Sequence, residues 1–162
     1  MTDTINALFE NVVANRKDKI AVIENNRTLT FGELSNLVDI IAESFPVETT
    51  SVGIVMQHRA EMIASMLAVL KCGARYVPAE PTFPTGRIQY MMKEAQVDFI
   101  LTEKEHENKL DGFPLRLVDC EICGVELPVT RKMAAQPPEL PAYVLYTSGT
   151  TGTSQRSLCY KP

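Results

Sequence analysis

Short apolar segments alternate with segments of helical periodicity from residue 51 onward, and this alternation constrains the fold more than any other feature. Residues 51–56, 75–78 and 97–102 are apolar and bounded by turn residues, as strands are. Apolar residues at helical spacing separate them, first over 59–72 and then from Pro84. Strands that alternate with helices of this length are typical of βαβ units. We therefore predict an α/β fold with βαβ units around a mostly parallel sheet.

Each segment of this region has a predicted place in the fold. The helix over 59–72 should stop at Gly73 and be buried on much of its surface, so that it needs packing partners. The next helix, which follows Pro84, turns one apolar face to the core, formed by Ile88, Met91, Met92 and Ala95. Residues 115–118 read as another strand, and the charged stretch 103–111 before it reads as a loop.

The N-terminal residues predict a helix followed by a hairpin. Apolar residues at positions i, i+3, i+4 and i+7 indicate an amphipathic helix that ends near Asn15, with an apolar stripe of Ile5, Leu8, Phe9 and Val12. Asn25–Asn26 tolerates the left-handed conformations of a tight turn. We expect this pair to join short antiparallel strands at 20–23 and 27–30.

A capping signal marks the start of a second helix. Thr30 is followed three residues later by Glu33, which fits a capping box. Leu29 and Leu34 are placed to form the hydrophobic staple that accompanies such a box. The helix is expected to run to about Phe45.

Charge and hydropathy exclude several classes of partner. The 162 residues include 16 Lys and Arg against 20 Asp and Glu, a net charge of −4, and no basic run that could follow a phosphate backbone. We therefore expect no nucleic-acid partner. The chain has no cationic leader before a long apolar stretch and no run of about 18 apolar residues. These features predict a cytoplasmic protein with no membrane partner.

The cysteines are expected to be reduced thiols. Cys120 and Cys123 form a single CxxC pair, whereas a structural zinc site requires a second pair or a Cys/His continuation at ligand spacing. Ordinary thiols are therefore the favoured interpretation, and we assign no metal ligand. The residues from Cys120 to Pro141 contain several prolines, which predict a meandering connection.

The segment that carries chemistry follows a predicted buried strand. Residues 142–146 are apolar and aromatic, and they lead into a loop of hydroxyl residues and glycines: Thr147, Ser148, Gly149, Thr150, Thr151 and Gly152. Glycines let successive backbone N–H groups face one point, and hydroxyls add donors, so the loop suits an anion such as polyphosphate. A flexible linker is the alternative. A Walker A loop is excluded because two residues separate the glycines and no lysine follows.

Three segments resemble the AMP-forming adenylating enzymes, the superfamily of acyl-CoA synthetases, luciferase and nonribosomal peptide synthetase adenylation domains. Residues 143–152 resemble the family's phosphate-binding signature. Residues 70–90 resemble its amino-acid-activating branch, and 28–34 resemble an early family segment. The chain is identified as the N-terminal part of the large subdomain of such a domain, closest to the nonribosomal peptide synthetase branch. An acyl-CoA synthetase or a D-alanine ligase stays open as an alternative.

The resemblance implies that the parent enzyme activates a carboxylic acid. An amino-acid carboxylate would attack the α-phosphate of ATP and give an aminoacyl-adenylate and pyrophosphate. By resemblance, residues 147–152 hold the β- and γ-phosphates, and Mg²⁺ accompanies the ATP, although no Mg²⁺ ligand is assigned. The amino acid or other carboxylic acid is the expected partner of the parent enzyme.

The resemblance ends after Gly152, where the family continues with a lysine that this chain lacks. We assign 1–152 to the N-terminal part of an adenylation domain and 153–162 to a divergent tail. The segments that complete the acid pocket and supply the C-terminal catalytic lysine have no counterpart here. We therefore expect no adenylation by the chain alone, no catalytic residue within it, and ATP binding that is weak or absent.

Four further expectations follow from the sequence. A non-catalytic interaction module derived from the same subdomain is an alternative function, and apolar patches left by an incomplete fold favour self-association. His58, at a strand-to-helix junction, is interpreted as a helix-start or surface residue. The methionines at helical spacing, Met62, Met66, Met91 and Met92, are interpreted as core residues.

Overall fold

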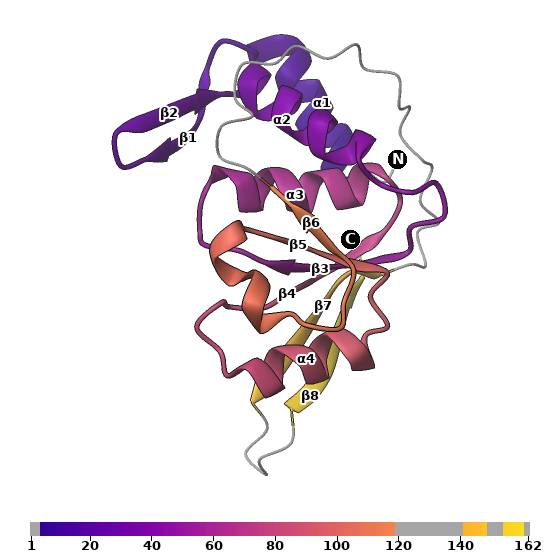
Figure 1. The fold of residues 1–162 in the computed structure, drawn as a ribbon. Coiled ribbons are helices and arrows are strands. Elements are labelled where there is room, and N and C mark those ends of the chain that lie inside the picture. The colour runs from indigo at the N-terminus through magenta and orange to yellow at the C-terminus, as the bar shows by residue number, and fades with distance from the viewer. Residues whose placement is uncertain (1–3, 119–140, 149–153, 161–162) are drawn as a thin grey trace.

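The protein is described by a computed structural model that covers residues 4–118, 141–148 and 154–160, with the backbone alone described for 147–148 and 154–160. Within these residues the chain forms a six-stranded sheet, a separate two-stranded hairpin and helices on both faces of the sheet (Figure 1). The segment 119–140, for which a meandering connection is predicted, lies outside the described residues.

The six-stranded sheet has the order β6-β5-β3-β4-β7-β8. Its first five strands are parallel, and β8 pairs with β7 antiparallel at one edge. The mostly parallel α/β sheet predicted from the alternation is therefore confirmed. The elements of this sheet and its connections are β3 (Ser51–Val55), α3 (Ala60–Lys71), β4 (Arg75–Pro78), α4 (Thr85–Glu94), β5 (Phe99–Thr102), η1 (Lys104–Lys109), β6 (Leu115–Leu117), β7 (Pro141–Ser148) and β8 (Ser154–Tyr160).

Two hydrophobic cores lie on opposite faces of the sheet. Alternate residues of a strand point to opposite faces, so Ile54 joins the core under α3 while Val55 joins the core over α4. Helices α1 (Ile5–Arg16) and α2 (Phe31–Glu43) extend the α3 side, and α4 covers the other face (Figure 1). The predicted face of α4 is confirmed, since Ile88, Met91, Met92 and Ala95 are all buried.

Helix α3 lies between α2 and the sheet. Three alanines at four-residue spacing, Ala60, Ala64 and Ala68, are fully buried within the shared core. Such small side chains let the helix backbone approach its neighbours closely. The sequence predicts a helix that needs packing partners, and α2 supplies one of them. The helix ends as predicted before Gly73, whose φ of 81° is a conformation that favours glycine.

Met92 of helix α4 packs directly against Gly53 of β3. A Cβ atom placed on Gly53 would lie 2.6 Å from Met92 Sδ and 3.0 Å from Ile100 Cγ1. Both neighbours are fully buried. The glycine therefore sets the spacing between β3 and α4.

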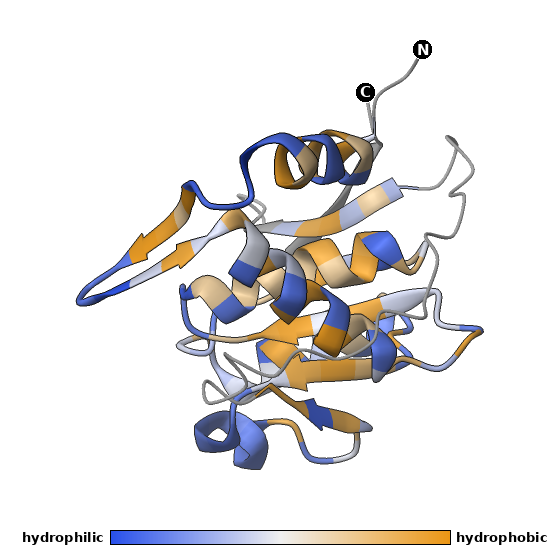
Figure 2. Cartoon of the chain, turned by 90° about the horizontal axis from the view of Figure 1, so that it is seen from above, coloured by the Kyte–Doolittle hydropathy of each residue, from blue (hydrophilic) through white to orange (hydrophobic). Residues whose placement is uncertain are grey.

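The predicted hairpin and capping box are both present. Strands β1 (Ile20–Glu24) and β2 (Arg27–Thr30) pair antiparallel, and Asn25 takes a positive φ of 46° at the turn. Figure 2 shows apolar residues along these strands and hydrophilic residues at the tip. Glu33 accepts hydrogen bonds from the Thr30 backbone N–H and hydroxyl, which lower the pKa of its carboxyl group.

Three sequence-based expectations need correction or extension. On α1, Ile5 and Leu8 are 39% and 51% exposed, because the helix packs through a face that holds buried Asn6 and half-buried Phe9. The segment 103–111, predicted as a loop, contains the 3₁₀ helix η1. The sequence assigned no structure to the tail after residue 152, yet most of it forms β8, which pairs with β7 along seven positions.

Candidate functional site

The carboxyl ends of β3, β4, β5 and β7 meet at one edge of the sheet, because these strands are parallel. The connections after β3 and β4 leave toward opposite faces, through α3 and α4. In open α/β sheets, adjacent connections that diverge in this way leave a crevice where ligands bind. This edge is the candidate site.

A cavity of about 230 Å³ occupies the crevice between the ends of β3, β4 and β7. Its wall is mainly apolar. His58 and Glu80 contribute charged or titratable side chains to it, and Leu145 and Tyr146 line it from β7. The lining residues are Ile54, Met56, His58, Met62, Met66, Pro78, Ala79, Glu80, Phe83, Met91, Leu145 and Tyr146. A concave apolar site with a small number of polar groups is the usual form of a small-molecule pocket.

His58 and Glu80 face each other at the cavity, from the connections that follow β3 and β4. His58 Nε2 lies 2.7 Å from Glu80 Oε1, and the side chains are 68% and 41% exposed. An ion pair this exposed contributes little stability. The interpretation of His58 as a surface residue at a helix start agrees with its exposure, but no sequence pattern predicted its partner.

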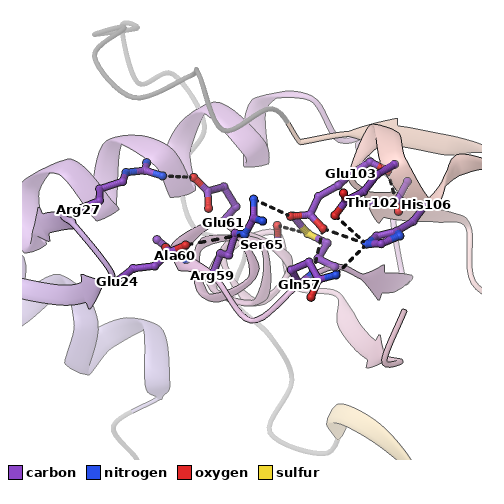
Figure 3. Close-up of polar contacts among 12 residues, drawn as sticks. Glu24, Arg27, Gln57, Arg59, Ala60, Glu61, Ser65, Thr102, Glu103 and His106 are labelled. Carbon is purple, nitrogen blue, oxygen red and sulfur yellow. Dashed lines mark hydrogen bonds and ion pairs between the residues drawn. The ribbon is translucent and has the colours of Figure 1, made fainter. Parts of the chain in front are cut away.

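A chain of charged groups runs along the same edge of the sheet (Figure 3). Glu24 of the hairpin accepts a hydrogen bond from the Ala60 backbone N–H at the start of α3, at 3.1 Å. Arg59 lies between two carboxylates, with its Nε 3.9 Å from Glu24 and its Nη1 4.0 Å from Glu103. Glu103, directly after β5, also accepts a hydrogen bond from the Gln57 backbone N–H at 2.9 Å. The network thus joins the hairpin to the ends of β3 and β5.

A buried ion pair fastens the hairpin to α3. Glu61 is 1% exposed, and its Oε1 lies 2.7 Å from Arg27 Nη1. Together with the bond from Glu24 to the helix start, this pair attaches both ends of the hairpin turn to the first turn of α3. The β3–α3 connection, which carries His58, is therefore held from the hairpin side.

The predicted phosphate loop begins at this edge. Strand β7 carries it: Ala142 and Val144 are buried, and the Tyr143 ring stacks on Tyr76 of β4 at 5.4 Å between centroids. The backbone of Thr147 and Ser148 forms the end of β7, paired with Gln155 and Ser154 of β8. The buried strand that leads into the loop is thus confirmed.

The remaining predicted site residues lie outside the described part of the chain: Gly149, Thr150, Thr151 and Gly152. Their role in binding phosphate therefore stays a prediction. The described end of β7 nevertheless reaches the cavity, since Leu145 and Tyr146 line its wall. The first two residues of the predicted loop, Thr147 and Ser148, therefore follow directly on residues that line the cavity.

Comparison with known proteins identifies the family of this chain. The sequence profile of the family described as "AMP-binding enzyme" matches residues 9–154. The chain belongs to this family. Tyrocidine synthase 1 of Brevibacillus parabrevis is 34% identical over 158 residues, which cover 92% of this chain and 14% of that protein. Zwittermicin A synthase ZmaJ of Bacillus cereus is 33% identical, over 94% of this chain and 30% of its own length. The chain thus spans less than a third of each of these relatives.

Solved structures of the same kind share the fold. The N-terminal subdomain of Klebsiella oxytoca NpsA, in complex with 3-hydroxybenzoyl-AMSN, superposes with a TM-score of 0.84 at 20% identity. The match covers 98% of this chain and 41% of that one. The nonribosomal peptide synthetase FmoA3, bound to α-methyl-L-serine-AMP, superposes with a TM-score of 0.83 at 24% identity, over 98% and 18%. The α/β adenylation-domain fold expected from the sequence motifs is confirmed.

Sequence reasoning missed the polar groups that surround the crevice. Glu80, Glu103 and Arg59 lie within two residues of a strand end or a helix start, where site residues often lie in α/β folds. Their position was a usable signal, but each is a common surface residue type.

Among the methionines, Met91 is buried as expected, whereas Met62 and Met66 are partly buried and line the cavity.

Proposed function

We propose that this chain is the N-terminal part of an amino-acid-adenylating domain and that residues 147–152 bind the β- and γ-phosphates of ATP. The observation that carries the proposal is the position of β7, a buried parallel strand whose carboxyl end meets the cavity at the site edge. The family match over residues 9–154 and the peptide synthetase relatives support an amino acid as the second substrate.

In the parent reaction, the substrate carboxylate forms a bond to the α-phosphorus of ATP while the bond to the leaving pyrophosphate breaks. The protein's contribution to such a transfer is to orient the two reactants and to stabilise charge on phosphate oxygens. In this chain, backbone N–H groups and hydroxyls of the loop would donate to the β- and γ-phosphates. Mg²⁺ would arrive with the ATP, and we assign none of the described residues as its ligand.

The same proposal limits what this chain does alone. We assign residues 1–152 to the N-terminal part of an adenylation domain and residues 153–162 to a divergent tail that lacks the family's lysine. Three or four loop hydrogen bonds, each with a net value of about 1 kcal/mol, give an affinity of about millimolar. We expect weak ATP binding and no complete adenylation without the remaining segments.

Self-association and location are part of the proposal. Two hairpin residues, Ile20 and Ile23, are 55% and 74% exposed, and the hairpin projects from the helical layer (Figure 1). These apolar side chains favour contacts between copies, which would appear as concentration-dependent mass in analytical ultracentrifugation.

Within the described residues, no helix is long and apolar enough to cross a bilayer. We propose a cytoplasmic location on the sequence features given above.

Calorimetric titration with ATP tests the phosphate site. The expected dissociation constant is about millimolar, tripolyphosphate should compete, and AMP should not, because the loop holds the outer phosphates. Thr150→Ala and Thr151→Ala should each weaken binding about fivefold, the equivalent of one hydrogen bond of about 1 kcal/mol. Thr28→Ala, in the exposed hairpin, is the matched control and should change nothing. Micromolar affinity, or binding that both loop variants leave unchanged, would refute the assignment.

A further inference from the structure

A cluster of metal-ligating side chains lies at the carboxyl end of β5, outside the groups used by the proposed function. Glu103, Glu105 and His106 each offer one ligand atom, and these atoms lie within 4.8 Å of one another. Gln57, at the end of β3, brings its side-chain amide to the same place (Figure 3). We propose that these four residues bind a divalent transition-metal ion, with Zn²⁺ as the best-fitting ion. The inference does not depend on the phosphate site.

One ring nitrogen of His106 faces three polar groups at once. Its Nε2 lies 3.2 Å from Glu105 Oε1, 3.4 Å from Glu103 Oε2 and 3.4 Å from the Gln57 amide. A ring nitrogen carries either one hydrogen or one lone pair, so it serves one such partner well. Two of the three separations, at 3.4 Å, are longer than the roughly 2.7–3.2 Å of ordinary N–H···O hydrogen bonds, and all three are longer than the roughly 2.7–2.9 Å of charge-assisted ones. Hydrogen bonds among these groups therefore explain poorly why three polar groups surround His106 Nε2.

A tetrahedral metal ion accounts for it better. Zn²⁺ lies about 2.0–2.1 Å from nitrogen and oxygen ligands, and a tetrahedron of that size has edges of about 3.3–3.4 Å. The three separations from His106 Nε2, 3.4, 3.2 and 3.4 Å, match those edges. The Gln57 amide would turn its oxygen to the ion, and the oxygen and nitrogen of such a group exchange places by a simple flip.

A buried carboxylate supplies a second, separate indication of a cation. The Glu103 side chain is 8% exposed, and its Oε1 has no hydrogen-bond partner among the described residues. The Arg59 guanidinium is 4.0 Å away, beyond hydrogen-bond distance. Leaving a buried carboxylate oxygen without a donor is costly. A cation held at the neighbouring Oε2 would offset the charge of this carboxylate, which shares Arg59 with Glu24.

The donor set selects the class of ion. Imidazole nitrogen combined with carboxylate oxygen suits Zn²⁺ and its transition-metal neighbours, whereas Mg²⁺ prefers oxygen ligands in octahedral geometry. Access is available on one side, since the Glu105 side chain is 57% exposed while that of His106 is 11% exposed. An ion would therefore enter past Glu105 and bind the more buried ligands, His106 and Glu103.

Calorimetry with the untagged, metal-stripped full chain tests the proposal, using Zn²⁺ and then Co²⁺, whose visible absorption reports tetrahedral coordination. One equivalent should bind, and a similar concentration of Mg²⁺ should not compete. Glu105→Gln should weaken Zn²⁺ binding at least about tenfold. Glu107→Gln, on the same 3₁₀ helix but outside the cluster, is the matched control and should leave affinity unchanged. Both side chains are at least partly exposed, so thermal melting should show an intact fold.

Thiols are the competing ligands, and the experiment separates them from the cluster. Coordination by Cys120 and Cys123 would add a sulfur-to-cobalt charge-transfer band in the near ultraviolet, which the proposed nitrogen and oxygen site does not produce. Binding that persists unchanged in both Glu105→Gln and His106→Asn overturns the proposal. So does binding that is lost in the Cys120→Ser, Cys123→Ser double variant. Failure of the wild-type chain to bind one equivalent overturns it as well.

Discussion

The ion pair between Arg27 and Glu61 offers the sharpest test of how the hairpin is attached to α3. Arg27→Met removes the guanidinium that lies 2.7 Å from the Glu61 carboxylate. Glu61 is 1% exposed, and its second oxygen has no hydrogen-bond partner among the described residues. The substitution therefore leaves a charged carboxylate buried without its cation.

The magnitude follows from this asymmetry of burial. Removing one partner of a buried ion pair costs about 3–5 kcal/mol. Because the Arg27 side chain is 33% exposed, water can reach part of the vacated space, and we expect the lower end, about 3 kcal/mol. This is a large share of the roughly 5–15 kcal/mol by which domains are stable. Glu61→Met should cost less, because the remaining guanidinium can turn toward water.

Urea denaturation followed by far-ultraviolet circular dichroism measures these effects, since the chain contains no tryptophan. The double variant Arg27→Met, Glu61→Met replaces the pair by apolar groups and should recover to within about 1 kcal/mol of the wild type. Arg16→Met, at an exposed position at the end of α1, is the control and should change stability by less than about 0.5 kcal/mol. Equal losses for Arg27→Met and Arg16→Met, or no recovery in the double variant, would refute the reasoning.

Three smaller perturbations address other parts of the fold. Thr30→Ala removes the cap of α2 and should cost about 1 kcal/mol in the same denaturation assay; a loss below about 0.3 kcal/mol would contradict the capping box. The pKa of Glu33 is lowered in the folded state, so its contribution is present above the ordinary value of 4.5 and is lost as pH falls through the folded value. The stability difference between wild type and Glu33→Gln should therefore shrink in acid, and a constant difference from pH 7 to pH 3 would oppose this account. Gly53→Ala places a Cβ 2.6 Å from Met92 Sδ and should destabilise by about 1–3 kcal/mol, whereas an unchanged urea midpoint would show that α4 moves freely.

Local patterns predicted most of the fold because they reflect local physics. The box of Thr30 and Glu33 satisfies helix-end N–H groups that no tertiary contact needs to supply, so its presence was readable in advance. The alternation of strand and helix segments was likewise visible in the sequence, and it predicted the mostly parallel sheet. On α1 the pattern was wrong about exposure, because the orientation of a helix depends on its partners, and α1 turns Asn6 inward.

The candidate site was less predictable because it is assembled from distant segments. The loop predicted to bind phosphate is a continuous motif in the sequence, and the structure describes the strand that leads into it. The pairing of His58 with Glu80 joins two connections that follow different strands, and the same holds for Gln57 with His106. No spacing along the chain encodes such pairs. They follow from strand order, which the sequence pattern leaves open.

Amino-acid-dependent exchange of pyrophosphate into ATP tests the central claim most directly. The full chain, shown to be folded by circular dichroism, would be assayed with each proteinogenic amino acid, ATP, Mg²⁺ and labelled pyrophosphate. Because the chain spans less than a third of the length of the relatives reported above, we predict exchange no faster than in the no-enzyme control. Exchange clearly above that control with any amino acid would contradict the account, because the chain would then contain a complete adenylation site.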